Sequence, residues 1–181
     1  NSEIIVGVDF TNHKRVNELL HAKNRQSFLL YPGKENFNLS TRKSSEIIPF
    51  MGKTPNIFIL DGTWPCARKM LKLSKNIQQL QRISFDNDIQ SKFIIKQQPE
   101  SLCLSTIESV YTVINLLNKG NLEQSETKKF LFPFEKMIEY QVACILNPDN
   151  KNYRSNIKRQ ITPKDNYKKG TDRNTIFEQK K

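Results

Sequence analysis

Short apolar runs alternate along the chain with segments in which apolar residues recur every three or four positions. Runs rich in β-branched and aromatic residues are typical of strands, and Gly, Pro and polar residues mark their ends. This pattern predicts strands at 3–8, 27–31, 57–60, 80–85 and 93–95. The run at 57–60 is wholly apolar, which predicts a strand that is covered on both faces.

Helical periodicity lies between these runs and after them. The predicted helices are 11–22 with Thr11 as its cap, 65–73, 105–119, and 122–146, which Pro133 divides. Residues 38–55 are polar and interrupted by prolines and a glycine, which predicts a loop with a short edge element at 47–48. Strands that alternate with helices favour an α/β fold with a largely parallel sheet flanked by helices.

Basic residues are in excess and gather toward the C-terminus. The chain has 29 Lys and Arg against 18 Asp and Glu, a net charge of +11. Residues 147–181 contribute +6 of this, and apolar residues thin out there. We therefore predict one domain at 1–146 and a basic C-terminal tail, extended or disordered, at 147–181. A basic protein of this size often meets a polyanion such as nucleic acid.

The cysteines and the apolar runs exclude two classes of protein. Cys66, Cys103 and Cys144 are scattered, odd in number and without metal-ligand spacing, which favours a reducing cytoplasm over a disulfide framework. No apolar run approaches the ~20 residues of a membrane helix, and no signal peptide is visible. We expect a cytoplasmic protein with no membrane partner.

Residues 57–70 are the most informative segment, a predicted strand followed by a polar loop and a helix start. Gly62 permits a turn that bulkier residues resist, and Pro65 suits the first turn of a helix. Ligands bind in open α/β sheets at the carboxyl ends of the strands, where this loop lies. Asp61 and Trp64, an ionisable group beside a large aromatic, are therefore candidate site residues.

Three segments of the chain resemble, in the expected order, the motifs of the DTW-domain family. They are Phe28–Gly33, Asp61–Trp64 with Ala67–Met70, and Leu104–Glu108, and the resemblance covers roughly residues 1–140. It implies a tRNA-uridine aminocarboxypropyltransferase, which moves the 3-amino-3-carboxypropyl group of S-adenosylmethionine onto N3 of a tRNA uridine. It also implies a SPOUT-like, trefoil-knotted form of the fold, with residues 1–146 as the catalytic domain.

The motifs and the basic segments supply the predicted site. The catalytic residues are Asp61, Thr63 and Trp64. The contacts to S-adenosylmethionine are Leu30, Tyr31, Pro32, Leu60, Gly62, Leu104, Ser105, Thr106 and Glu108. The RNA contacts are Arg68, Lys69, Lys72, Arg154, Lys158 and Arg159. Family members commonly carry a cysteine-rich, zinc-binding element near the N-terminus, but this sequence shows none and we assign no metal.

Most of these residues also suit structural roles. Asp61 suits a general base that accepts the N3 proton of uridine, but equally a helix cap or an Asx-turn. Trp64 suits stacking on the target uridine, a wall of the cofactor pocket, or packing in the core. Thr63 suits a substrate hydrogen bond or a helix cap.

The remaining candidates carry the same ambiguity. Ser105 and Glu108 match a capping box, and the capped helix start also offers N–H donors to a ligand. The carboxylate of the methionine arm needs such donors, from this helix start or from Lys34. Arg68 and Lys72 share a helix face that is either solvated or in contact with phosphates. Two alternative functions stay open, a SPOUT-like S-adenosylmethionine-dependent RNA methyltransferase and a non-enzymatic basic RNA-binding module.

Overall fold

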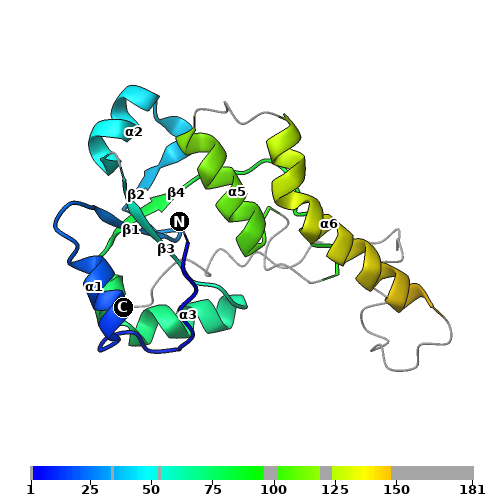
Figure 1. Ribbon diagram of the computed structural model, residues 1–181, viewed down its shortest axis with the longest axis horizontal. Helices are drawn as coiled ribbons and strands as arrows, with labels where there is room; N and C mark the ends of the chain where they lie inside the picture. The colour runs from blue at the N-terminus through cyan, green and yellow to red at the C-terminus, as the bar shows by residue number, and fades with distance from the viewer. Residues whose placement is uncertain (1, 34, 53, 96–101, 119–123, 148–181) are drawn as a thin grey trace, which may run out of the picture. The chain divides into compact units, whose positions relative to one another are not determined.

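The chain forms two compact units, one from Asn1–Asp86 and one from Asn87–Lys181. The computed structural model describes residues 2–33, 35–52, 54–95, 102–118 and 124–147 (Figure 1). The predicted tail therefore lies outside the described residues, apart from Asn147, and the predicted domain boundary after residue 146 stays a prediction. Among the described helices, none is both long enough and apolar enough to cross a membrane.

The first unit is built on a four-stranded sheet, with the strand order β2-β4-β1-β3. All three neighbouring pairs are parallel, and Leu29 lies level with Phe58 on one side and Arg82 on the other. The strands are β1 Ser27–Leu30, β2 Asn36–Asn38, β3 Asn56–Ile59 and β4 Gln81–Ser84. The parallel α/β architecture expected from the sequence is thus confirmed.

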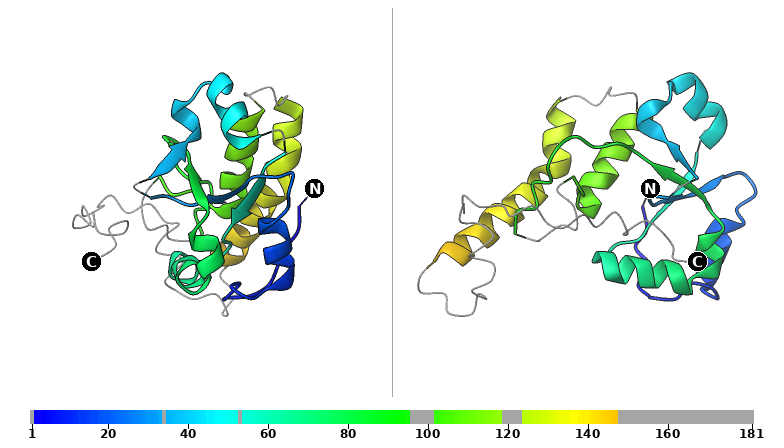
Figure 2. Two further views of the ribbon diagram at one scale, coloured as in Figure 1. Left: turned by 90° about the vertical axis from the view of Figure 1, so that its left-hand side faces the viewer. Right: turned by 180° about the vertical axis from the view of Figure 1, so that it is seen from behind.

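Helices cover both faces of this sheet. The elements are α1 Lys14–Leu20, the 3₁₀ turn η1 Leu39–Thr41, α2 Ser44–Met51, α3 Trp64–Leu73 and α4 Lys75–Gln78. Figures 1 and 2 show α1 and α3 together on one side of the sheet and α2 on the other. This arrangement follows from the alternation of side chains along a strand, which sends neighbouring residues of β1 to opposite faces.

Two neighbouring residues of β1 define the two layers. Leu29 is fully buried and packs in one cluster with Val16, Leu71 and Ile77, which come from α1, α3 and α4. Phe28 points to the other face, where its ring lies 5.3 Å from that of Phe50 in α2. A helix that presents its apolar stripe to the sheet buries it in this way, and the burial supplies most of the stability of such a layer.

The predicted first strand at 3–8 is wrong. The segment is extended but belongs to no strand, and the side chains of Ile4 and Val6 are 92% and 91% exposed. Only Ile5 packs against the core, and an ion pair of 3.0 Å joins Glu3 to Arg15 of α1. Figure 2 shows this dark blue segment beside α1 rather than along a sheet edge. An alternating apolar pattern describes one strand, but a strand also needs a hydrogen-bonding partner.

The predicted loop at 38–55 is also wrong, because α2 occupies much of it. The Glu46 carboxylate accepts a hydrogen bond of 2.9 Å from the Lys43 backbone N–H, which caps the helix start. Ile47 and Met51, four positions apart, bury the inner face of the helix. Pro49 lies near the end of α2, where its missing N–H removes only one backbone hydrogen bond. The strand β2 was not predicted either.

The helix predicted at 11–22 is shorter than expected and has a different cap. The His13 ring accepts a hydrogen bond of 3.4 Å from the Val16 backbone N–H, so α1 begins at Lys14. The Thr11 hydroxyl instead donates to the Leu73 carbonyl at 3.0 Å. Thr11 therefore ties the segment before α1 to the end of α3 rather than starting a helix.

The described part of the second unit contains two helices, α5 Thr106–Leu117 and α6 Gln124–Leu146. Val113 of α5 is buried, as are three residues along one side of α6, Phe134, Ile138 and Ile145. The expected division at Pro133 is wrong, since α6 runs through it and Pro133 lies exposed. The strand predicted at 93–95 is also absent. Residues 94 and 95 form a turn, and the Phe93 ring packs 5.5 Å from Phe134.

The two layers of the first unit make a direct prediction about stability. Replacing Leu29, which is fully buried, by Ala should lower the free energy of unfolding by about 2–5 kcal/mol, because the lost contacts leave a cavity. The matched variant Ile4→Ala should change it by less than about 0.5 kcal/mol, because that side chain is exposed. Urea denaturation measures both. A large loss in Ile4→Ala would show that segment 3–8 is paired after all.

Candidate functional site

The predicted loop after β3 lies at the carboxyl end of the parallel sheet, as expected from the sequence. Asp61, Gly62 and Thr63 are exposed there, and Thr63 holds the N-cap position of α3. The Thr63 side chain makes no capping hydrogen bond, but its carbonyl accepts one of 2.8 Å from the Ala67 N–H. Thr63 rather than Asp61 therefore occupies the helix cap, which leaves the Asp61 side chain exposed on the loop.

Glycine is required at position 62. Its φ of 157° is one that L side chains rarely adopt, and an added Cβ would lie 3.2 Å from Cys66 Cβ and 3.3 Å from Met70 Cε. The loop thus packs closely onto the first turns of α3. This close packing fixes the position of the loop that carries the exposed Asp61.

The strand that leads into the loop is less buried than its sequence predicts. Each residue of β3 is only half-buried. The reason is its place in the sheet, since β3 lies at the end of the strand order and, among the described strands, pairs only with β1. A wholly apolar run predicts cover on both faces, and here that prediction is wrong for the described structure.

Two aromatic rings and a guanidinium form a cluster at the same edge of the sheet. The ring of Tyr31, directly after β1, meets the ring of Trp64 edge-on with 6.2 Å between centroids. The guanidinium of Arg82, from β4, also lies over the Tyr31 ring, with Cζ 5.6 Å from the ring centroid. Arg82 Nη1 donates a long hydrogen bond of 3.4 Å to the Pro32 carbonyl. We call Tyr31, Trp64 and Arg82 the edge cluster.

Charges around the edge cluster act on Tyr31. Burial raises the pKa of the Tyr31 hydroxyl above its usual range, and the nearby positive charges of Arg68 and Arg82 oppose that rise. The hydroxyl therefore remains protonated at neutral pH. Arg68 follows Trp64 by one turn of α3, so the helix brings a cation as well as an aromatic ring to this edge.

Sequence reasoning missed Arg82. It lies inside a run predicted to be a strand, between Gln81 and Ile83, where a charged residue signals either an exposed face or a site. The neighbour Ile83 is fully buried, whereas Arg82 is half-buried. An arginine between a polar and an apolar residue in a short predicted strand was the available signal. Its contact with Tyr31 depends on the pairing of β1 with β4.

Glu108 closes the predicted capping box at the start of α5, in the second unit. Its carboxylate accepts hydrogen bonds from the Ser105 N–H at 2.8 Å, the Ser91 hydroxyl at 2.6 Å and the Lys92 N–H at 2.7 Å. Burial alone would raise the pKa of Glu108, but the hydrogen bonds from Ser105, Ser91 and Lys92 lower it below its ordinary value. The capping box is confirmed, and it also holds residues 91 and 92 against the helix start.

The structure therefore brings together the predicted site residues of the first unit. The carboxyl edge of the sheet carries, at or after the end of β1, after β3 or in the first turns of α3, the residues Leu30, Tyr31, Pro32, Leu60, Asp61, Gly62, Thr63, Trp64 and Arg68. Lys69 and Lys72 lie further along α3. In the second unit, around the start of α5, are Leu104, Ser105, Thr106 and Glu108. Outside the described residues are Lys34, Arg154, Lys158 and Arg159. The roles assigned to all of them stay predictions.

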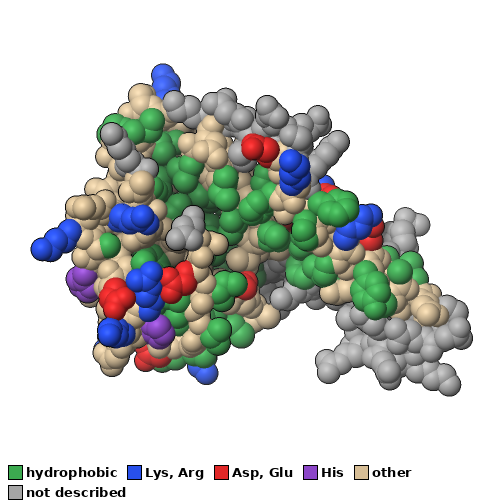
Figure 3. Space-filling view, viewed as in Figure 1, with side chains coloured by type: hydrophobic (Ala, Val, Ile, Leu, Met, Phe, Trp, Pro, Cys, Tyr) green, Lys and Arg blue, Asp and Glu red, His purple; other side chains and the backbone are tan. Residues whose placement is uncertain are grey.

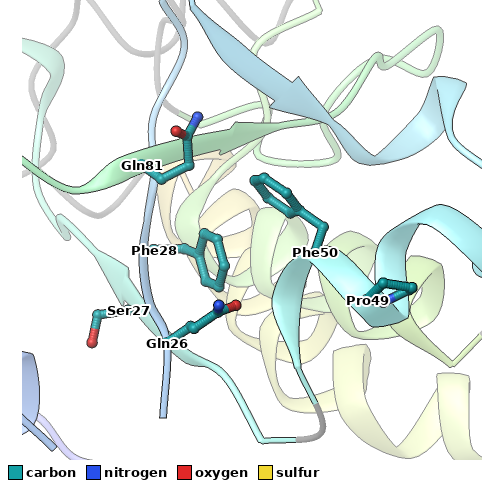
Figure 4. A pocket seen from close by; sticks show the side chains of 6 residues that line it. All are labelled: Gln26, Ser27, Phe28, Pro49, Phe50 and Gln81. Carbon is teal, nitrogen blue, oxygen red and sulfur yellow. The ribbon is translucent and has the colours of Figure 1, made fainter. Parts of the chain in front are cut away.

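An open pocket of about 490 Å³ lies at the opposite edge of the sheet (Figure 4). It is lined by Gln26, Ser27, Phe28, Pro49, Phe50 and Gln81. Ser27 and Gln81 are the first residues of β1 and β4, so the pocket lies at the amino ends of the strands. Its lining holds amides, a hydroxyl and two phenyl rings but no ionisable group, so it does not supply acid–base chemistry.

Basic side chains are exposed along α3, where Arg68, Lys69 and Lys72 all reach solvent. On the face of the first unit drawn in Figure 3, Lys and Arg side chains lie interspersed with acidic ones rather than in one continuous patch. Phosphate contacts position a nucleic acid without reading its sequence. Among the described basic residues, those of α3 share a helix with Trp64, which makes them the candidates for such phosphate contacts.

No disulfide joins Cys66, Cys103 and Cys144, all of which lie in the described part of the chain. Within the described ranges, no three His, Cys, Asp or Glu side chains come together as a possible metal site.

A parallel α/β unit with a carboxylate and an aromatic cluster at the carboxyl edge defines the class, an α/β domain with a candidate ligand site at the end of its strands. Comparison with known families places it further. The DTW domain matches residues 1–142, and the chain belongs to this family. No solved structure matches the chain.

Three curated proteins, each named tRNA-uridine aminocarboxypropyltransferase 2, are similar to this chain. The one from Macaca fascicularis is 28% identical over 117 residues, which are 64% of this chain and 37% of that protein. The one from Mus musculus is 25% identical over 138 residues, 76% of this chain and 44% of that protein. The one from Drosophila melanogaster is 26% identical over 138 residues, 75% and 51%. The matched part of the chain thus spans about half or less of each relative's length.

The hydrogen bonds of Glu108 predict how stability depends on pH. Because folding lowers its pKa, the carboxylate stabilises the fold above its ordinary pKa of 4.5, and this contribution is lost as the pH falls through the lower, folded-state value. Glu108→Gln should therefore lower the free energy of unfolding at pH 7 by about 1–3 kcal/mol. The gap to the wild type should shrink progressively below pH 4.5.

Denaturant titrations from pH 3 to pH 7 measure this effect. The control is Glu139→Gln, since Glu139 pairs with Lys136 on the exposed side of α6. That exposed pair contributes little, and the variant should unfold as the wild type does. A gap for Glu108→Gln that stays constant across the range would contradict the proposed ionised network.

Proposed function

We propose that this chain carries the activity of a tRNA-uridine aminocarboxypropyltransferase, with S-adenosylmethionine as the group donor and N3 of a tRNA uridine as the acceptor. Membership of the DTW family and the names of three relatives support the reaction class. The observation that carries the proposal is the exposed Asp61 loop beside the edge cluster, at the carboxyl end of the sheet. A loop packed inside the core would exclude it.

The described residues at this edge fit such a donor. S-adenosylmethionine carries an adenine, a positively charged sulfonium and an amino-acid arm with a carboxylate. Aromatic faces attract cations, and Tyr31 and Trp64 lie together here. The carboxylate of the arm needs a cation, and guanidinium groups are present on α3 and β4. The residues present therefore offer partners to the sulfonium and to the carboxylate of the donor.

Asp61 acts in this proposal as the general base. The N3 proton of uridine is only weakly acidic at neutral pH, so nitrogen becomes a competent nucleophile when a carboxylate within about 3 Å takes that proton. The donor supplies a methylene carbon already activated by the sulfonium. The new N–C bond forms as the C–S bond breaks, and the electron pair stays on sulfur to leave 5′-methylthioadenosine. The chain then has to orient the two partners.

The acceptor RNA is held, in this proposal, by the cations of α3. Arg68, Lys69 and Lys72 are exposed on the helix that starts at Trp64, so phosphate contacts there bring a uridine to the same edge. Trp64 offers a ring for stacking on a base taken out of its own stack. The basic residues of segment 147–181 extend this surface only as a prediction.

Two finer assignments belong to the same proposal. The SPOUT-like trefoil-knotted fold is supported by the parallel sheet and its flanking helices, and a crystal structure of the chain tests it directly. A cytoplasmic location is supported by three thiols that form no disulfide. Fractionation of cells that express the full-length protein tests that location.

The base assignment makes the central functional prediction. Asp61→Asn should slow transfer by a factor of about 10²–10⁴, because the amide cannot take the proton, while the affinity for S-adenosylmethionine stays within about threefold of wild type. Mass spectrometry of nucleosides from unmodified tRNA, incubated with the enzyme and carboxypropyl-labelled S-adenosylmethionine, measures the transfer. The control Asp9→Asn changes another exposed aspartate, which accepts a hydrogen bond from Thr11, and should react as the wild type does.

The same assay separates the competing functions. A wild-type product that is heavier by one methyl group would identify an RNA methyltransferase. A wild-type protein that binds tRNA but no S-adenosylmethionine in calorimetry would identify an RNA-binding module. If Asp61→Asn reacts at the wild-type rate, Asp61 is not the base.

A further inference from the structure

Arg82, the arginine of the edge cluster, lies outside the three family motifs, and the proposed chemistry does not say which guanidinium meets the carboxylate of the donor. Its guanidinium lies over Tyr31, and one N–H donates to the Pro32 carbonyl. A guanidinium has five N–H donors in a fixed fork, so this contact leaves donors for an acid group. None of the ion pairs formed among the described residues includes Arg82.

The surroundings of Arg82 hold its side chain in place. A Cβ on Gly33 would lie 2.6 Å from Arg82 Nη1 and 3.2 Å from its Cδ, so a larger residue there would displace the guanidinium. Tyr31 supports it from one side, and the pairing of β4 between β1 and β2 fixes the backbone. An arginine restrained in this way loses little further freedom when it binds a ligand.

A second arginine of the same unit shows what an arginine without such a role looks like. Arg42 also lies over a ring, with Cζ 5.4 Å from the centroid of Phe37. Arg42, however, pairs with the Glu46 carboxylate at 3.1 Å and is exposed. Arg82 has the aromatic support but, among the described residues, no carboxylate partner, and it is half-buried. A positive charge taken partly out of water without a counter-ion favours an anionic ligand.

We propose that Arg82 binds the carboxylate of the aminocarboxypropyl group and thereby sets which carbon on the donor's sulfur faces the uridine. This inference rests on the proposed function. Three carbons are attached to a sulfonium, and transfer of the amino-acid arm rather than the methyl group requires that the arm be held toward the acceptor. Guanidinium and carboxylate match as two parallel N–H···O bonds, which fix direction as well as position. Arg82 is then a positioning residue for the donor.

Phosphate of the RNA is the competing anion for Arg82. Arg82 is half-buried next to Tyr31, which favours the small carboxylate of the donor over the backbone of an RNA. The exposed cations of α3 are better placed for phosphates, because their long side chains reach solvent. Phosphate contacts in nucleic-acid interfaces are made mostly by such exposed Lys and Arg side chains. The test therefore includes tRNA binding as a separate measurement.

Calorimetry on the full chain tests the proposal with two donors, S-adenosylmethionine and its decarboxylated analogue, which lacks only the carboxylate. Arg82→Gln should weaken binding of S-adenosylmethionine by about 10–100-fold, the value of a charge-assisted hydrogen bond. Its affinity for the decarboxylated analogue should equal that of the wild type. Arg82→Lys, which keeps the charge but not the fork, should fall between. The control Arg42→Gln should bind both donors as the wild type does.

Each other outcome overturns the inference. An equal loss of affinity for both donors would give Arg82 a merely structural role, and thermal melting of each variant shows whether the fold has changed. If Arg82→Gln does not fold, an equal loss for both donors in Arg82→Lys is decisive instead. Unchanged donor affinity with weakened, less salt-dependent tRNA binding would assign Arg82 to phosphate. The wild-type chain is measured first. If it binds neither donor, the proposed function itself is wrong, whatever the variants show.

Discussion

The packing of α1 and α3 against one face of β1 is the interaction on which the rest of the first unit depends. Leu29 lies at its centre, fully buried among residues of three helices. Because side chains alternate along a strand, Tyr31 is directed to the same face two positions later. The helix that covers Leu29 also begins with Trp64. The same layer of core packing therefore stabilises the sheet and determines where Tyr31 and Trp64 of the edge cluster lie.

The same layer explains how distant parts of the sequence meet at one edge. Tyr31, Trp64 and Arg82 come from three separate elements, and parallel pairing aligns the strands that carry or precede them. The loop after β3 depends in turn on Gly62, whose lack of a side chain lets it lie against Cys66 and Met70. An exposed carboxylate and a half-buried cation are thus presented by a rigid support, as a transfer reaction between two bound partners requires.

The sequence predicts much of the architecture but little of its pairing. Strands at 27–31 and 80–85 and helices starting near 65 and 105 were predictable, because apolar runs, capping residues and prolines act locally. Segment 3–8 has the same alternation, but no partner strand, and local patterns do not encode partners. The prolines and the glycine in and around α2 predict a loop, but Ile47 and Met51 form the buried face of a helix there. Arg82 became visible only through a contact between β4 and the end of β1.

The carboxylate of Glu108 has a further consequence for motion in the second unit. It joins the start of α5 to residues 91 and 92 through several short hydrogen bonds. Helices ordinarily fray from both ends, because terminal backbone groups lack partners. In α5 the Glu108 carboxylate anchors the first turn, so the helix is expected to fray more readily at its Leu117 end. The amide protons of Ser105 and Lys92, which are both bonded to this one carboxylate, are therefore expected to exchange with solvent together, in a single opening of the helix start.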